Sequence, residues 1–144
     1  MINYKIFTDG SCRANGNGGI GIVWLKDNEK VYEFSKGFKG VTNNKMELVA
    51  ILYAILSIKK PINSLEIVSD SEYSIGVLTN PKWNPKKNIK LIEFIKKAIK
   101  VKQKLIKTPI VWTHTRGHQS DNSENTKWNK LADKLCTDAS NMIL

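Results

Sequence analysis

The chain has 144 residues, 41% of them hydrophobic and 25% charged, which predicts a single globular domain, 1–144, that needs no disulfide staple. Its two cysteines, Cys12 and Cys136, are too few for a disulfide framework and lack the spacing of a zinc site. No apolar run is long enough for a signal peptide or a transmembrane helix. We therefore expect a monomeric, cytoplasmic protein in a reducing compartment, with no membrane partner. The net charge is +10.

Three short segments near the N-terminus have the composition of β-strands. Residues 4–8 form a β-prone run that ends at the turn signal Asp9-Gly10-Ser11. The glycine-rich segment 15–21 predicts a hairpin connection, and residues 20–25 and 31–38 predict the next two strands. The three strands are therefore expected to follow one another in series.

A helix is predicted next, and it extends to about Lys59, just before Pro61. Either Asn43 or Asn44 can cap its N-terminus. Helical spacing is kept by the following apolar residues: Met46, Val49, Leu52 or Tyr53, and Leu56.

Strands and helices alternate in the rest of the chain. Residues 65–69 predict a strand, Ser71 can cap a short helix after it, and Trp83 lies in a loop bracketed by two prolines. Residues 110–113 predict a last strand, and a last helix begins near 125–129. Three strands in series and then alternation predict an α/β (α+β mixed) fold, in which helices flank a mixed sheet.

Residues 89–106 predict an amphipathic helix that is rich in lysine. Its apolar face is expected to contain Leu91, Ile92, Phe94, Ile95, Ala98, Ile99 and Leu105. Its opposite face is expected to contain Lys90, Lys96, Lys97, Lys100 and Lys104. Residues 82–107 carry ten lysines and one acid, so this segment holds most of the net charge. Such a patch suits a polyphosphate partner, and a solvated helix face is the equal alternative.

Four carboxylates lie at strand ends or on helices that border the sheet. Asp9 and Asp70 end predicted strands, and the carboxyl ends of strands meet at the ligand crevice of an open sheet. Glu47 and Asp133 border apolar helix positions and are expected to lie near the sheet. No Lys or Arg is placed to neutralise all four, and buried acids must be paired or bind metal. Oxygen ligands alone favour Mg²⁺ or Mn²⁺.

Each acid also has an ordinary structural interpretation when it is taken alone. Asp9 precedes a glycine, as in many turns, and Asp70 can mark the start of a helix. Glu47 can lie on the surface, and Asp133 can pair with Asn129 four residues earlier. The joint pattern favours the metal site.

The chain resembles type 1 ribonuclease H over nearly its whole length. The matching segments are Thr8-Asp9-Gly10-Ser11-Cys12, Thr42-Asn43-Asn44-Lys45-Met46-Glu47-Leu48, Ser69-Asp70-Ser71-Glu72-Tyr73, Gly117-His118 and Asn129-Lys130-Leu131-Ala132-Asp133-Lys134-Leu135. The resemblance implies a ribonuclease H-like fold with a five-stranded mixed sheet. It also implies an endonuclease that hydrolyses the RNA strand of RNA–DNA hybrids and leaves 5′-phosphate and 3′-hydroxyl ends.

The resemblance also implies the roles of the acids in two-metal-ion catalysis. Asp9 is expected to bridge two Mg²⁺ ions, for which Mn²⁺ can substitute. Glu47 and Asp70 complete one site, and Asp133 helps to hold the other. A gap-free comparison places Asn129 at the fourth position instead, but Asp133 fits the helix pattern of the family better. His118 corresponds to a histidine that assists proton transfer or product departure.

Further residues resemble the substrate contacts of the family. The expected groove contacts are the backbone amides of Ser11 and Cys12 and the side chains of Asn15, Asn43, Asn44 and Glu72. Trp83 resembles the aromatic residue that lies against the DNA strand, and the basic residues expected to bind the substrate are Lys86, Lys87, Lys90 and Lys97. Glu72 stands where the family often has glutamine, and a carboxylate cannot donate a hydrogen bond.

Other interpretations of some of these residues stay open. Trp83 can equally be a core residue, and Asn43 and Asn44 can be caps alone. His114, on a strand, is expected to be structural. The alternative function is a catalytically weak nucleic-acid-binding module of the same fold, against which the four intact acids argue.

Overall fold

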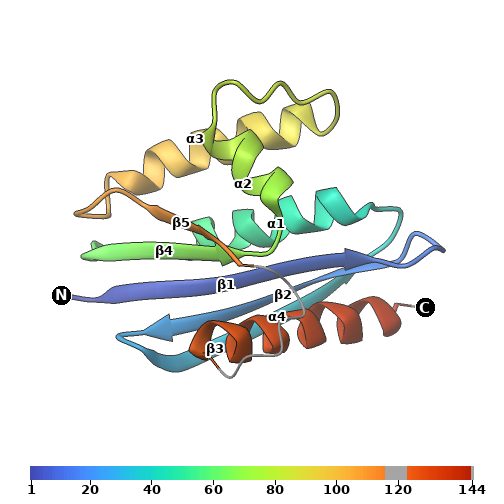
Figure 1. Ribbon diagram of the computed structural model, residues 1–144, viewed down its shortest axis with the longest axis horizontal. Helices are drawn as coiled ribbons and strands as arrows, with labels where there is room; N and C mark the ends of the chain where they lie inside the picture. The colour runs from blue at the N-terminus through green and yellow to red at the C-terminus, as the bar shows by residue number, and fades with distance from the viewer. Residues whose placement is uncertain (116–122, 144) are drawn as a thin grey trace.

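The computed structural model describes residues 1–115 and 123–143. In these residues the chain forms a five-stranded sheet in the order β3-β2-β1-β4-β5 and four helices (Figure 1). The strands are β1 (Asn3–Cys12), β2 (Gly18–Lys26), β3 (Glu29–Phe38), β4 (Ser64–Ser69) and β5 (Val111–His114). The helices are α1 (Asn43–Leu56), α2 (Glu72–Thr79), α3 (Ile89–Gln103) and α4 (Glu124–Asn141).

The sheet is mixed, as the sequence predicts. β1 lies in the middle, pairs antiparallel with β2 and parallel with β4, and β4 pairs parallel with β5. In the parallel register, Thr8 lies opposite Ser69. The next residue of each chain segment is an aspartate, so Asp70, directly after the end of β4, lies beside Asp9 of β1. The expected turn at Asp9-Gly10-Ser11 is wrong, because these residues continue to pair with β2 and β1 extends to Cys12.

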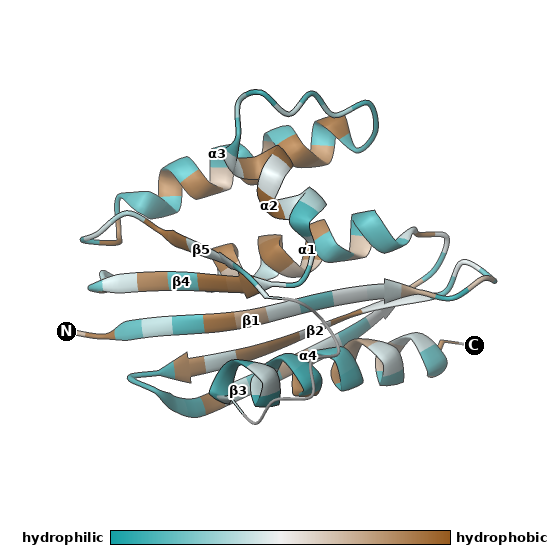
Figure 2. Ribbon diagram, in the orientation of Figure 1, coloured by the Kyte–Doolittle hydropathy of each residue, from teal (hydrophilic) through white to brown (hydrophobic). Residues whose placement is uncertain are grey.

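The two faces of the sheet are covered by different helices (Figure 1). Side chains alternate along β1, so Ile6 belongs to the core that contains α1, α2 and α3 residues, and Phe7 belongs to the core that contains Ala132 of α4. Figure 2 shows hydrophobic residues in the central strands and in α1 and α3, whereas α4 is mostly polar. Asp9 follows the same alternation as Phe7, which places it on the face that α4 covers.

The hairpin connection is shorter than expected, because its glycines belong to a strand. Gly18, Gly19 and Gly21 lie in β2, and α4 packs directly on the last two. A Cβ atom at Gly19 would stand 2.3 Å from the carbonyl oxygen of Cys136, and one at Gly21 would stand 2.1 Å from that of Ala132. These glycines are needed so that a helix can approach the sheet backbone, which composition alone did not reveal.

Helix α1 differs from the expectation at both ends. Thr42 is the N-cap, because its side chain accepts a hydrogen bond from the backbone N–H of Lys45 at 3.3 Å, so neither Asn43 nor Asn44 is the cap. The helix ends at Leu56, which is 40% exposed. Since α1 packs against both the sheet and α3, its buried surface is too broad for a single stripe.

The expected apolar face of α3 is wrong at one residue. Ile92 and Ile95 are buried, but Phe94 is 52% exposed. Successive helical residues are separated by about 100°, so Phe94 points well away from the line that joins the two isoleucines. The helix therefore presents an exposed aromatic ring among its lysines. No helix within residues 1–115 and 123–143 is long and apolar enough to cross a membrane.

Candidate active site

Three carboxylates converge where β4 ends beside β1. Carboxylate oxygens of Asp9, Glu47 and Asp70 lie within 4.8 Å of one another. Asp9 is 5% exposed and Glu47 is 8% exposed, whereas Asp70 is half-buried. The parallel pairing of β1 with β4 brings the two aspartates together, and α1 supplies the glutamate.

Gly10 explains why Glu47 reaches this position. A Cβ atom at Gly10 would stand 2.3 Å from the backbone carbon of Met46 and 2.5 Å from the backbone nitrogen of Glu47. Only a glycine therefore lets the first turn of α1 lie against the end of β1. The backbone N–H of Gly10 donates to Glu47 Oε1 at 2.5 Å and lies 2.9 Å from Asp9 Oδ1.

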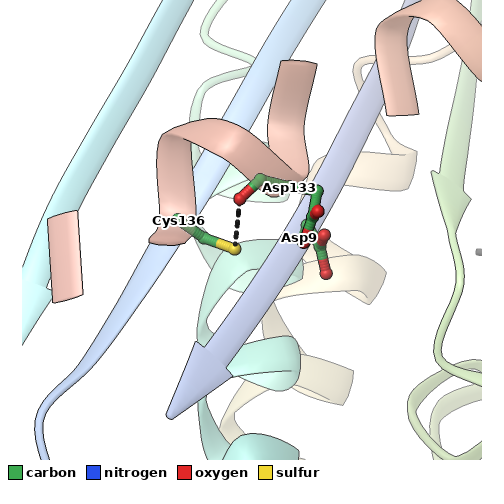
Figure 3. A group of neighbouring side chains, drawn as sticks. All are labelled: Asp9, Asp133 and Cys136. Carbon is green, nitrogen blue, oxygen red and sulfur yellow. Dashed lines mark hydrogen bonds between the residues drawn. The ribbon is translucent and has the colours of Figure 1, made fainter. Parts of the chain in front are cut away.

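Helix α4 adds a fourth carboxylate from the other face. Oxygen atoms of Asp9 and Asp133 and the Sγ atom of Cys136 lie within 4.8 Å of one another (Figure 3). Cys136 is fully buried, and its Sγ donates to the backbone oxygen of Asp133 at 3.1 Å. Asp9 is therefore common to both groups of side chains.

The crowding of acids shifts their protonation. Burial, and then the charges of Asp70 and Asp133, raise the pKa of Asp9 from 3.8 to about 7. Burial, and then the neighbouring Asp9, raise the pKa of Glu47 well above its usual value. Burial is also the first cause, and Asp9 the second, that raises the pKa of the Cys136 thiol to about 12.

The donor set fits a hard divalent cation. Within the described residues, Glu47 Oε2 is buried and has no hydrogen-bond partner, and the ion pairs of residues 1–115 and 123–143 involve other carboxylates. A buried acceptor without a donor is costly. A cation between the three carboxylates would satisfy this oxygen and remove the repulsion that raises the two pKa values.

A polar cleft lies beside the first turn of α1. Its volume is about 560 Å³, and its lining residues are Thr42, Asn43, Asn44, Tyr73, Lys86, Lys87 and Asn88. The cleft thus brings together four of the expected substrate contacts, two asparagines and two lysines. Tyr73 was not singled out from the sequence, although its place directly after Glu72 in the Asp70 motif was a signal.

Other expected contacts lie around this cleft. The backbone N–H of Cys12 donates to Asn43 Oδ1 at 2.6 Å, so that amide already has an acceptor. Ser11 is half-buried at the end of β1, and Asn15 is exposed and accepts from the N–H of Asn17 at 2.9 Å. Glu72 is exposed in the first turn of α2.

The aromatic and basic residues beyond the cleft are exposed. Trp83 is 37% exposed, and its indole covers Gly76, where a Cβ atom would stand 2.6 Å from the ring. Trp83 is therefore not a core tryptophan. Lys90 and Lys97 are exposed on α3 and do not line the cleft.

The two histidines lie in different parts of the chain. His118 lies outside the described residues. His114 is exposed at the end of β5, and its Nε2 lies 3.2 Å from the backbone oxygen of Asp70. This contact ties the end of β5 to the loop that holds the aspartate.

Comparison with known proteins agrees with this geometry. Residues 2–141 match the family model of RNase H. A ribonuclease H of Actinobacillus pleuropneumoniae is 38% identical over 135 residues, which cover 89% of this chain and 86% of that protein. A ribonuclease H of Clostridium botulinum is 36% identical over 147 residues, which cover 90% and 92%. The fold is shared with the crystal structure of LC11-RNase H1 in complex with an RNA/DNA hybrid, at a TM-score of 0.75 and 22% identity over 96% of this chain and 97% of that chain.

Proposed function

Because the chain belongs to the ribonuclease H family, we propose that it hydrolyses the RNA strand of RNA–DNA hybrids at the cluster of Asp9, Glu47 and Asp70. The convergence of these three carboxylates within 4.8 Å carries the proposal. The hybrid bound by the related LC11-RNase H1 supports the choice of substrate. A catalytically weak binding module is not favoured, since such a module has no need for repelling, buried acids.

The acids would hold divalent cations, for which we propose two Mg²⁺ ions that Mn²⁺ can replace. Asp9, Glu47 and Asp70 would hold one, and Asp9 with Asp133 would hold the other. When bound, such cations would lower the pKa of a water ligand and neutralise charge at the scissile phosphate. Hydrolysis would then leave 5′-phosphate and 3′-hydroxyl ends.

The protein's own residues orient this centre. The Gly10 N–H fixes Glu47 Oε1, which leaves Glu47 Oε2 free for a cation. His114 supports the loop of Asp70 from β5. For His118 we propose a part in proton transfer or product departure.

The cleft beside the cluster is a suitable binding site for the hybrid. We assign Asn43, Asn44, Lys86 and Lys87 to its walls. Amide and hydroxyl groups can distinguish RNA by its 2′-hydroxyls, and lysines neutralise phosphates. Further proposed contacts are Ser11, Cys12, Asn15, Glu72, Trp83, Lys90 and Lys97. Asn43 must release the Cys12 N–H if that amide is to meet a 2′-hydroxyl.

We propose further that residues 1–144 act as one domain and as a monomer. Both cysteines are free thiols, which supports a reducing, cytoplasmic location.

The proposal is tested by cleavage of three labelled duplexes in Mg²⁺: an RNA–DNA hybrid, an RNA duplex and a DNA duplex. We expect cleavage of the RNA strand of the hybrid only. Asp9→Asn should lower the rate about 10³-fold or more, because it removes a charge shared by both groups of ligands. Asp138→Asn, an exposed acid of α4 paired with Lys134, is the matched control and should cleave normally. Equal cleavage of the three duplexes, or an active Asp9→Asn protein, would refute the proposal.

A further inference from the structure

A sulfur donor lies at the edge of the acidic cluster. The Sγ atom of Cys136 and carboxylate oxygens of Asp9 and Asp133 all lie within 4.8 Å of one another. Figure 3 shows the three side chains gathered between β1 and α4. This set shares Asp9 and Asp133 with the second cation position proposed above and adds a thiol, so a soft ion and Mg²⁺ would compete for the same two carboxylates.

One buried acceptor on α4 has no donor beside this set. Asn129 lies one turn before Asp133, is 5% exposed, and its Oδ1 has no partner among the described residues. Burial raises the pKa of the Cys136 thiol, although a side-chain hydrogen bond with Ser11 favours the thiolate. A buried acceptor without a donor indicates a missing donor or cation.

The kind of cation follows from the donor atoms. Oxygen ligands hold Mg²⁺ and Mn²⁺, whereas a thiolate favours Zn²⁺ and related soft ions. A tetrahedral ion with metal–sulfur bonds of about 2.3 Å and metal–oxygen bonds of about 2.0 Å keeps its ligands roughly 3.5 Å apart. Donors that lie within 4.8 Å of one another therefore need to approach by about 1 Å. The side-chain torsions of an aspartate and a cysteine can supply such a movement.

We propose that Asp9, Asp133 and Cys136 form a mixed oxygen–sulfur site for a thiophilic divalent cation such as Zn²⁺ or Cd²⁺. As the metal–sulfur bond forms, the S–H bond breaks and its proton passes to water, with no change of oxidation state. The site goes beyond the proposed function, because binding requires neither substrate nor catalysis. Only one consequence rests on that function: a soft ion that occupies Asp9 should inhibit hybrid cleavage.

The test is a titration of the metal-free, full-length protein with Cd²⁺, followed by the ultraviolet absorption of the cadmium–thiolate bond. The wild type should show a saturable band. Cys136→Ser should abolish it, and Cys12→Ser, at the other cysteine of the chain, should retain it. Asp133→Asn keeps the sulfur but removes one oxygen charge, so it should weaken binding at least tenfold.

Two results would overturn the site: no band in the wild type, or a band that survives Cys136→Ser and disappears with Cys12→Ser. If Cys136→Ser fails to fold, as judged by circular dichroism, the decision falls to Asp133→Asn, and unchanged Cd²⁺ affinity in that variant rejects the proposal. Failure of the nuclease assay with an intact Cd²⁺ band would reject the proposed function alone.

Discussion

Asp9 is the residue that both groups of metal-binding candidates share, and its protonation contributes to the pH dependence of the stability of the metal-free protein. Its pKa is about 7 in the fold, against 3.8 for an ordinary aspartate, chiefly because it is buried. The folded state therefore binds more protons than the unfolded state between about pH 4 and pH 7. The free energy of unfolding falls as the pH rises through this window, and the fall is complete above it.

Asp9→Asn should therefore stabilise the metal-free protein at pH 8. The difference between a pKa of about 7 in the fold and 3.8 in the unfolded chain corresponds to about 4 kcal/mol. Because the acids titrate together, we expect a gain of roughly 1–4 kcal/mol. Urea unfolding in EDTA at pH 8 and pH 4 measures it, and the gain should nearly vanish at pH 4. The exposed Asp138→Asn should show no such gain. A destabilised Asp9→Asn protein at pH 8 would contradict the electrostatic account.

The sequence motifs predicted the acids of the site but not every residue that lies beside them. Asp9, Glu47 and Asp70 could be predicted because each stands in a recognisable segment, although Asp9 lies inside β1 rather than at the strand end that was expected. Cys136 could not, since a lone cysteine on a helix has no motif, and only the packing of α4 on β2 brings it to Asp9. A side chain placed by tertiary contact leaves little trace in local sequence.

Elements were predicted most accurately where their signals are local. The strand predicted at 65–69 and the Ser71 cap depend on neighbouring residues, and both agree with the structure, in which β4 begins one residue earlier. The glycines of β2 were predicted to form a loop, because the requirement for glycine at these positions comes from the close approach of α4, which is distant in the sequence. Phe94 was wrongly predicted to lie on the buried face of α3. The average direction of the apolar residues does not show how wide the buried part of a helix is.

Because α4 packs directly on the backbone of β2, Gly21→Ala should strongly destabilise the protein. The added Cβ would lie 2.1 Å from the carbonyl oxygen of Ala132 and 2.7 Å from the backbone nitrogen of Cys136. Backbone atoms cannot rotate out of the way as a side chain can, so the helix must shift. We expect the free energy of unfolding to fall by about 3 kcal/mol or more. Ser35→Ala, at the exposed residue that pairs with Gly21, is the matched control and should be nearly neutral. Chemical unfolding of both variants measures the difference, and equal stability would show that α4 is not seated on this glycine.

The cap of α1 gives a milder prediction for the same element that carries Glu47. Thr42→Ala removes the hydroxyl that accepts from the Lys45 N–H, so stability should fall by about 1 kcal/mol. Asn44→Ala, in the first turn but not the cap, should change stability by less than about 0.5 kcal/mol. Thermal unfolding of the two proteins compares them directly. A larger destabilisation by Asn44→Ala would restore the asparagine as the cap.

At the scale of the whole molecule, the net positive charge is concentrated in one segment. Ten lysines belong to the segment 82–107, which contains the cleft residues Lys86 and Lys87 and the exposed face of α3, whereas the clustered acids come from β1, α1, α4 and the end of β4. Such an arrangement lets phosphates bind beside the acids without placing lysines among them. The charged surface can then supply affinity while the cluster supplies chemistry.

Replacing Lys90, Lys97 and Lys100 together by alanine tests whether α3 takes part in that affinity. Each phosphate that a lysine no longer neutralises should reduce the slope of log binding constant against log salt by about 0.9 or less, so the slope should become shallower by up to about 2–3. Binding is measured on the Asp9→Asn background, which leaves the hybrid uncut. The control replaces Lys59, Lys60 and Lys107, three exposed lysines around the far end of α1, and removes an equal charge. Lys107 ends the segment 82–107 but lies beyond α3, where its backbone N–H donates to Ile62, so this change should barely alter the slope. If the two triple variants behave alike, only the total charge matters and α3 is a solvated helix face rather than a binding surface.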